Sequence, residues 1–178
     1  MKIGIAGAGG IGSNVALNLV RSGVKQFKIV DFDRIEKSNL NRQFYFEDQI
    51  GNHKVHMLKR NLERIDHTIR IEIEVLKLDR TNIYETFKDC GIIVEGFDCA
   101  EYKKILLEEF AGSGKQLVSA SGIAGNQLDN IKVKNIGNCT IAGDFVSDFR
   151  DHKIYSPKVL MVASIMSNII LEKGGFFE

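Results

Sequence analysis

The first twenty residues constrain the fold more than any other part of the chain. A short apolar run, residues 2–6, leads into Gly7-Ala-Gly-Gly-Ile-Gly12, and apolar side chains then recur at helical spacing over residues 11–20. The first glycine permits a tight turn, the second lets backbone approach a phosphate, and the third lets the helix pack closely on the strand. Gly7, Gly9, Gly10 and Gly12 are therefore candidate nucleotide-binding positions, at a helix N-terminus that faces an anion.

The rest of the chain alternates short apolar runs with segments of helical spacing, a pattern typical of a doubly wound sheet. Strands are predicted at residues 27–30, 69–76, 92–94 and 117–119, helices at 53–65, 81–87, 100–111 and 159–171, and an antiparallel pair at 131–136 and 140–142. We predict an α/β fold: a Rossmann-like, mostly parallel sheet with helices on both faces and a small antiparallel extension near the C-terminus. At 178 residues the chain is expected to form one domain, residues 1–178.

Composition excludes several classes of function. The 24 Lys and Arg residues nearly balance the 23 Asp and Glu residues, so the net charge offers no long-range attraction for nucleic acid or for an anionic membrane. The apolar start is too short for a signal peptide or a membrane span, and we expect a cytoplasmic protein. The three cysteines contain no C-x-x-C pair, so neither a disulfide framework nor a zinc site is expected.

Two acidic residues follow the second predicted strand. Asp31 stands where a dinucleotide fold places a carboxylate on the ribose hydroxyls, and it disfavours a 2′-phosphate there. Asp33 has two readings that the sequence leaves open: a part in the site, or a cap of the following loop.

The next loop separates the possible nucleotides. Glycines and an acidic residue are compatible with NAD, FAD or ATP, but Asn39, Arg42 and Gln43 cluster in this loop and Lys54 follows it. A triphosphate carries more charge than a dinucleotide pyrophosphate and needs fixed cations such as Arg42 and Lys54 around its leaving group. The pattern therefore favours ATP.

These motifs resemble a known family. Gly-x-Gly-Gly-x-Gly-Ser, Asp31-Phe-Asp33, Ser38-Asn-Leu-Asn-Arg-Gln43 and Ile50-Gly-x-x-Lys-Val55 resemble the ThiF/MoeB family, relatives of ubiquitin-activating enzymes. Later motifs are similar to the short bacterial ThiF-type proteins of thiamine biosynthesis: Val94-Glu-Gly-Phe-Asp98 with Lys103, Ser121-Gly-Ile-Ala-Gly125, Gly143-Asp144 and Pro157-Lys-Val159.

The resemblance implies a role for each candidate residue. Asp31 would bind ribose, Asn39, Arg42 and Lys54 would hold the phosphates, and Gln43 would support that loop. Asp98 would hold Mg²⁺, and its place beyond the carboxyl end of an apolar strand suits one carboxylate acting together with phosphate oxygens. Asp98 is also placed to be the N-cap of the helix at 100–111.

The reaction implied is ATP-dependent adenylylation of the C-terminal glycine carboxylate of a small ubiquitin-like sulfur carrier ending in Gly-Gly, in thiamine biosynthesis. Arg42, Lys54 and Mg²⁺ would carry most of the rate, since the enzyme contributes alignment and charge neutralisation. A homodimer is expected.

Two alternatives remain open from the sequence. The chain could be a non-catalytic member that binds nucleotide or carrier without adenylating it. An NAD-dependent oxidoreductase fits the glycines and Asp31 but leaves Arg42, Lys54 and Asp98 unexplained.

Overall fold

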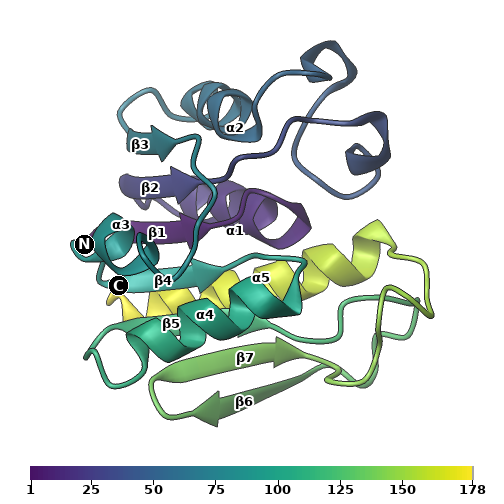
Figure 1. Cartoon of the computed structure of the whole chain (residues 1–178). Helices are drawn as coiled ribbons and strands as arrows, with labels where there is room; N and C mark the ends of the chain where they lie inside the picture. Colours follow the sequence, from purple (N-terminus) through teal and green to yellow (C-terminus); the bar gives the residue numbers. More distant parts are fainter. Residues whose placement is uncertain (178) are drawn as a thin grey trace.

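Seven strands form one twisted sheet in the order β3-β2-β1-β4-β5-β7-β6 in the computed structural model, which describes residues 1–177 (Figure 1). The strands are β1 (Ile3–Ala6), β2 (Gln26–Val30), β3 (Arg70–Glu74), β4 (Ile92–Glu95), β5 (Gln116–Ala120), β6 (Lys132–Ile136) and β7 (Cys139–Gly143). Every neighbouring pair is parallel except β6 and β7. The predicted α/β class, mostly parallel sheet and antiparallel extension are confirmed.

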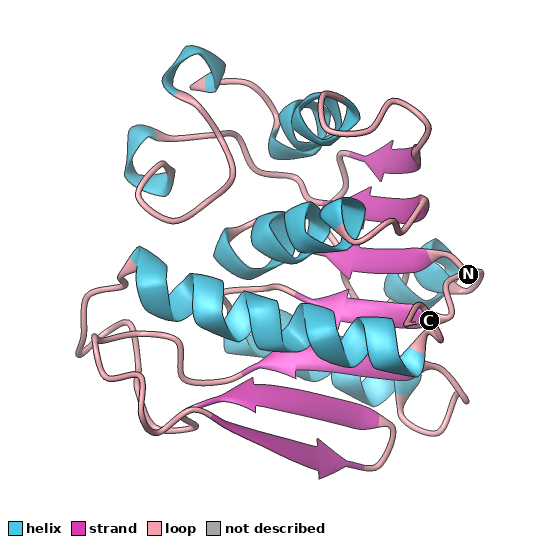
Figure 2. Ribbon diagram, turned by 180° about the vertical axis from the view of Figure 1, so that it is seen from behind, coloured by secondary structure: helices cyan, strands magenta, loops and turns pink. Residues whose placement is uncertain are grey.

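Helices cover both faces of the sheet, as Figures 1 and 2 show. α1 (Gly10–Arg21), α2 (Lys54–Glu63) and α5 (Ser156–Lys173) pack on one face, and α3 (Ile83–Phe87) and α4 (Ala100–Phe110) on the other. α5 begins at Ser156 with Pro157 in its first turn, where the fixed φ of proline suits a helix and its missing N–H costs nothing. No helix in residues 1–177 is long and apolar enough to cross a membrane.

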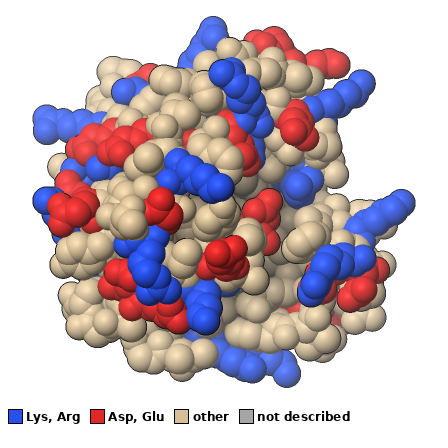
Figure 3. Space-filling model, in the orientation of Figure 1, with Lys and Arg blue, Asp and Glu red and all other residues tan. Residues whose placement is uncertain are grey.

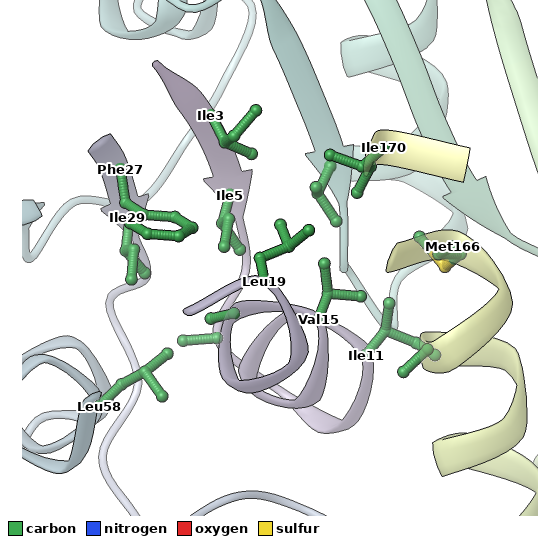
Figure 4. Packing of buried hydrophobic residues seen from close by; sticks show 14 of the residues in the cluster. Ile3, Ile5, Ile11, Val15, Leu19, Phe27, Ile29, Leu58, Met166 and Ile170 are labelled. Carbon is green, nitrogen blue, oxygen red and sulfur yellow. The ribbon is translucent and has the colours of Figure 1, made fainter. Parts of the chain in front are cut away.

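The strands alternate their side chains between two hydrophobic clusters, because successive residues of a strand point to opposite faces. Ile3 and Ile5 of β1 face α1, where Val15 and Leu19 meet them, as Figure 4 shows. Ala6, at the end of β1, belongs to the cluster under α3 and α4. The central strands are therefore buried on both faces, as their unbroken apolar runs predict.

The two edges of the sheet differ from the centre. All five residues of β6 are exposed, and Lys132 and Lys134 place charge along this edge, a common protection against unwanted strand pairing. At the other edge β3 ends at Glu74, two residues before the end of the strand predicted at residues 69–76. Acidic and basic side chains are interspersed over the face drawn in Figure 3.

The order of the strands defines where a ligand binds. β1 lies between β2, which follows it in the chain, and β4, so the winding of the sheet reverses between β1 and β4. In open α/β sheets the crevice outside the carboxyl ends of the strands at such a reversal is the usual binding site.

Candidate nucleotide-binding site

A cavity lies at the carboxyl ends of β1, β2 and β4. It brings together nine of the eleven residues that the sequence singles out: Gly7, Gly9, Gly10, Asp31, Asp33, Arg42, Gln43, Lys54 and Asp98. Gly12 and Asn39 do not line it. Residues separated by up to about ninety positions in the chain thus share one site because each follows a strand of the same parallel sheet.

The glycine turn is shaped by two close approaches. Gly7 has a φ of +94°, and a Cβ there would lie 2.9 Å from the carbonyl oxygen of Gly96. A Cβ on Gly12 would lie only 1.9 Å from the carbonyl oxygen of Gly7, so Gly12 lets the turn and the helix pack closely. Its nucleotide-binding role stays a prediction.

α1 presents its N-terminus to the cavity. Gly9 is its N-cap, no side chain caps it, and its first turn carries no acidic residue. Its leading N–H groups therefore remain available, and with the helix dipole they favour a phosphate.

Asp31 is a buried carboxylate at the end of β2. Its Oδ2 accepts a hydrogen bond from Ala8 N at 2.6 Å, and its Oδ1 accepts one from Asp33 N at 2.7 Å. Burial raises the pKa of Asp31, against the opposing effects of Lys54 and of these two hydrogen bonds. Each carboxylate oxygen keeps a second lone pair, which suits it to accept from the hydroxyls of a ribose.

Tyr45 is a functional neighbour that the sequence analysis missed. Its hydroxyl donates to the carbonyl oxygen of Ala8 at 2.7 Å, so Ala8 is held through N by Asp31 and through O by Tyr45. Burial raises the pKa of Tyr45 well above its ordinary value, and the phenol stays a donor at neutral pH. Its only sequence signal is its position two residues after Gln43.

α1 also holds the loop that carries Arg42. Asn14 Nδ2 donates to the carbonyl oxygens of Gly10 at 2.6 Å and Arg42 at 2.8 Å, and Ser13 Oγ accepts from Phe44 N at 3.1 Å. Ser13 and Asn14 are both buried. The sequence indicates this contact only through two polar residues, Ser13 and Asn14, among the apolar residues of the predicted helix.

Arg42 lies on the cavity wall in an orientation set by its own loop. One terminal guanidinium nitrogen, Nη1, donates to the carbonyl oxygen of Ser38 at 3.1 Å and to Asn41 Oδ1 at 2.8 Å. A guanidinium has five N–H donors, so it can hold these two acceptors and still bind a phosphate.

Lys54 is the first residue of α2 and is largely buried. Its Nζ lies 2.7 Å from Asp33 Oδ2, and its backbone N donates to the carbonyl oxygen of Asp33 at 3.0 Å. Asp33, for which the sequence left two readings, lines the cavity and forms an ion pair there. The pair holds the ammonium group in place beside the site.

Asn39 and Gln43 differ in what they offer a ligand. Asn39 is buried, and its Oδ1 accepts from Glu36 N at 3.0 Å, closing the short 3₁₀ turn Lys37–Asn39. Gln43 lines the cavity, and its buried Oε1 has no hydrogen-bond partner within residues 1–177. The phosphate role of Asn39 stays a prediction.

Asp98 follows β4 and is exposed on the cavity wall. Its alternative reading as a helix cap is wrong: the N-cap of α4 is Cys99, which makes no side-chain capping bond. Asp98 falls one residue short because the chain bends at residues 98–99 before the helix begins. The carboxylate is therefore free of a capping duty.

Glu95, which in the sequence stands out only as part of the Val94–Asp98 motif, supports the segment that carries Asp98. It is fully buried, its Oε1 accepts from Phe97 N at 2.8 Å, and its Oε2 lies 2.7 Å from Lys103 Nζ and accepts from Ser119 Oγ at 2.6 Å. The satisfied carboxylate fixes the turn between β4 and α4.

The donor set fits magnesium bound together with a nucleotide. Mg²⁺ in such sites uses one or two carboxylates and completes its shell with phosphate oxygens and water, and Asp98 and Asp33 both line the cavity. Within residues 1–177 no group of three or more His, Cys, Asp or Glu side chains is arranged to hold a metal alone. The ion would thus depend on the phosphates.

Two of the three cysteines, Cys90 and Cys139, lie apart from this chemistry. Cys90 and Cys139 are buried, and burial raises the pKa of the Cys90 thiol to about 12 and that of Cys139 to about 11. Thiols with such pKa values are poor nucleophiles at neutral pH.

The chain is an α/β protein of the Rossmann-like class, with a glycine turn at a helix N-terminus and a carboxylate after the second strand. The chain belongs to the ThiF family, whose model matches residues 1–172. The family resemblance seen in the motifs is thereby confirmed.

Curated relatives carry adenylyltransferase names. The chain is 31% identical over 140 residues to the adenylyltransferase and sulfurtransferase UBA4 of Candida glabrata, covering 78% of this chain and 32% of that protein. It is 34% identical over 120 residues to the adenylyltransferase and sulfurtransferase MOCS3 of Caenorhabditis briggsae, covering 67% and 30%. The chain spans about a third of the length of these relatives.

Solved structures share the fold. E. coli tRNA N6-threonylcarbamoyladenosine dehydratase, TcdA, in complex with ATP has a TM-score of 0.81 at 18% identity, covering 98% of this chain and 87% of that chain. E. coli MccB with ATP has a TM-score of 0.77 at 21% identity, covering 99% and 56%.

Proposed function

We propose that this chain is an ATP-dependent adenylyltransferase that activates the C-terminal glycine carboxylate of a small ubiquitin-like sulfur carrier protein. The observation that carries the proposal is the meeting of Arg42 and Lys54 with Asp31 and the open N-terminus of α1 in one cavity. Two fixed cations beside a ribose-type carboxylate suit a triphosphate better than a dinucleotide. The adenylyltransferase names of the relatives support the same reaction.

The ribose and the three phosphates of ATP each have a matching group in the cavity. Asp31 accepts from the ribose hydroxyls, and the N–H groups at Gly9 and Gly10 hold the α-phosphate. Arg42 and Lys54 neutralise the β- and γ-phosphates, which leave as pyrophosphate.

The chemistry requires no side-chain nucleophile. A carboxylate oxygen of the carrier attacks the α-phosphorus, the bond between that phosphorus and the bridging oxygen breaks, and pyrophosphate carries away the electron pair. The product is an acyl-adenylate, and no proton needs to move. Arg42 and Lys54 stabilise the charge that develops on the leaving group, and Mg²⁺ held by Asp98 would add further neutralisation of phosphate charge.

The finer proposal is a carrier ending in Gly-Gly, a place in thiamine biosynthesis and a homodimer. It rests on the likeness of the Val94–Asp98 segment, Lys103 and Pro157-Lys-Val159 to short bacterial ThiF-type proteins. The test is ATP–pyrophosphate exchange with candidate carriers that end in Gly-Gly. Exchange that requires the terminal glycine supports the enzyme. Tight carrier binding without exchange would identify a non-catalytic binding module instead.

Nucleotide choice gives the first prediction. ATP with Mg²⁺ is expected to raise the melting temperature well above the shift caused by NAD at equal concentration, because only ATP presents a triphosphate to Arg42 and Lys54. At a hundredfold excess over Kd a ligand stabilises by about 2.7 kcal/mol. Differential scanning fluorimetry with both ligands measures this, and a larger shift with NAD would contradict the ATP assignment.

Asp98→Asn is expected to slow Mg²⁺-dependent exchange by at least about tenfold and to raise the Mg²⁺ concentration needed for half-maximal rate, because it removes the anionic ligand. Stability should change by less than about 0.5 kcal/mol, since Asp98 is exposed and caps nothing. Glu101→Gln, an exposed acid in the first turn of the same helix, is the matched control. An unchanged Mg²⁺ requirement in Asp98→Asn would remove Asp98 from the metal site.

A further inference from the structure

Lys77 contacts two aromatic residues of the cavity wall, Phe32 and Tyr102. It lies in the segment that leaves the sheet after β3, between Leu76 and Leu78, which both line the cavity. Its Nζ lies 5.9 Å from the ring centroid of Phe32 and 5.8 Å from that of Tyr102. Phe32 follows β2 and Tyr102 is in the first turns of α4, so one ammonium group contacts rings from two separate elements.

The surroundings of these rings form an apolar slot. Phe97 and Tyr102 are in contact, with ring centroids 5.8 Å apart, and Val30, Leu76 and Leu78 complete the wall. Arg42, Lys54 and the N-terminus of α1 supply the polar groups of the same cavity. A nucleotide has a matching division into a flat apolar base and an anionic phosphate chain.

Phe32 connects the slot to the rest of the site. It directly follows Asp31, whose carboxylate is free to take the ribose hydroxyls, so a base attached to that ribose has the slot beside it. Phe32 is 46% exposed as a residue, so its side chain is accessible to a stacking ligand. Lys77 itself is exposed and does not line the cavity, so its ammonium would border a base stacked there from the outside.

We propose that Lys77 is a positioning residue that latches the segment after β3 to α4 over the bound nucleobase, a role that rests on the proposed function. A cation over aromatic faces is attracted by their quadrupoles, and the attraction grows when a bound ring excludes water. The latch favours ligands that carry a base and contributes nothing to the phosphates, which Arg42 and Lys54 hold.

The test compares a ligand that has a base with one that lacks it. Isothermal titration of Lys77→Met with ATP should show affinity about three- to tenfold weaker than that of the wild type, whereas affinity for inorganic tripolyphosphate should stay within about twofold. Arg42→Ala should weaken the binding of both ligands. In pyrophosphate exchange Lys77→Met should raise KM for ATP and leave kcat within about twofold, because Lys77 acts on the base.

Two further variants separate the latch from plain charge. Lys77→Arg should restore ATP affinity, since a guanidinium also stacks on aromatic rings. Lys104→Met removes the same charge from an exposed position on α4 and should change neither affinity. Equal losses for ATP and tripolyphosphate in Lys77→Met, or no loss for either, would overturn the latch.

The outcomes also separate this proposal from the one on which it rests. A wild-type protein that binds neither ATP nor adenosine contradicts the proposed function, whatever Lys77 does. A wild type that binds ATP and a Lys77→Met variant that binds it equally well contradict the latch alone.

Discussion

Arg42→Ala is expected to lower the rate of ATP–pyrophosphate exchange by roughly thirty- to a thousandfold, about 2–4 kcal/mol of transition-state stabilisation. Arg42 lines the cavity and its guanidinium is held in advance by Ser38 and Asn41, so it needs little reorganisation when charge develops on the leaving pyrophosphate. Preorganised groups of this kind commonly make the largest single contribution to such reactions.

The measurement is the exchange rate at saturating carrier, together with carrier affinity for the same variant. Carrier binding should barely change, because the proposed role of Arg42 is to bind the phosphates of ATP. Arg42→Lys should rescue poorly, since an ammonium cannot reproduce the forked contact of a guanidinium with phosphate oxygens and with its two anchors. Lys37→Ala, which removes an exposed cation from the same loop outside the cavity, is the matched control.

Two results would count against the role of Arg42. Full rescue by Arg42→Lys would mean that only the charge matters and that the anchored geometry does not. A wild type that binds a Gly-Gly carrier tightly, shows no exchange and is indifferent to Arg42 would assign the chain to the binding modules of the family.

The fold was predictable because the spacing of apolar residues distinguishes the helices from the strands along the chain. The glycine turn, the apolar runs buried on both faces and the helical spacing between them permit few arrangements other than a doubly wound sheet. Boundaries were less predictable: the pattern of residues 69–76 continues past Glu74, but the chain leaves the sheet there to pass beside the cavity. The alternation of apolar and charged residues in this segment does not indicate that Lys77, which follows it, contacts two aromatic rings.

The positions of the candidate site residues followed from topology, and their partners did not. Asp31 and Asp98 each follow a parallel strand, so both reach the same crevice. Which atom a polar side chain bonds depends on neighbours distant in the sequence: Lys54 pairs with Asp33, and the side chain of Asn39 turns back to close its own turn. The contact of Tyr45 with the glycine turn depends on the path of the loop after β2, which has no regular pattern in the sequence.

A buried ion pair between Lys158 and Asp144 is another contact that the sequence pattern does not predict. Lys158 Nζ lies 2.6 Å from Asp144 Oδ2 and donates to the carbonyl oxygen of Ala124 at 2.6 Å, and only 1% of Lys158 is exposed. Asp144 Oδ1 accepts from the backbone N of Val146 and of Ser147, both at 2.8 Å. The pair thus joins the loop after β5, the loop after β7 and the start of α5.

Lys158→Met is expected to lower the free energy of unfolding by about 3–5 kcal/mol, because it leaves the Asp144 carboxylate buried without its counterion. Adding Asp144→Asn should recover at least about 1 kcal/mol, since the amide is neutral and its Oδ1 still accepts the two backbone N–H bonds. Urea unfolding of the single and double variants measures both effects. Lys88→Met, which breaks an exposed pair with Glu85, should change stability little.

The same pair predicts a dependence on pH. Burial opposes the charge on Asp144, but hydrogen bonds from Lys158 and from the backbone N–H of Ser147 and Val146 outweigh it and hold the pKa of Asp144 well below its usual range. A carboxyl whose pKa is lower in the folded state contributes stability above its unfolded pKa, about 3.9, and loses it as pH falls toward the folded value. Between about pH 4 and pH 2 the wild type should therefore lose more stability than the Lys158→Met/Asp144→Asn double variant. Parallel loss in both proteins would show that the pair does not carry the acid sensitivity of this region.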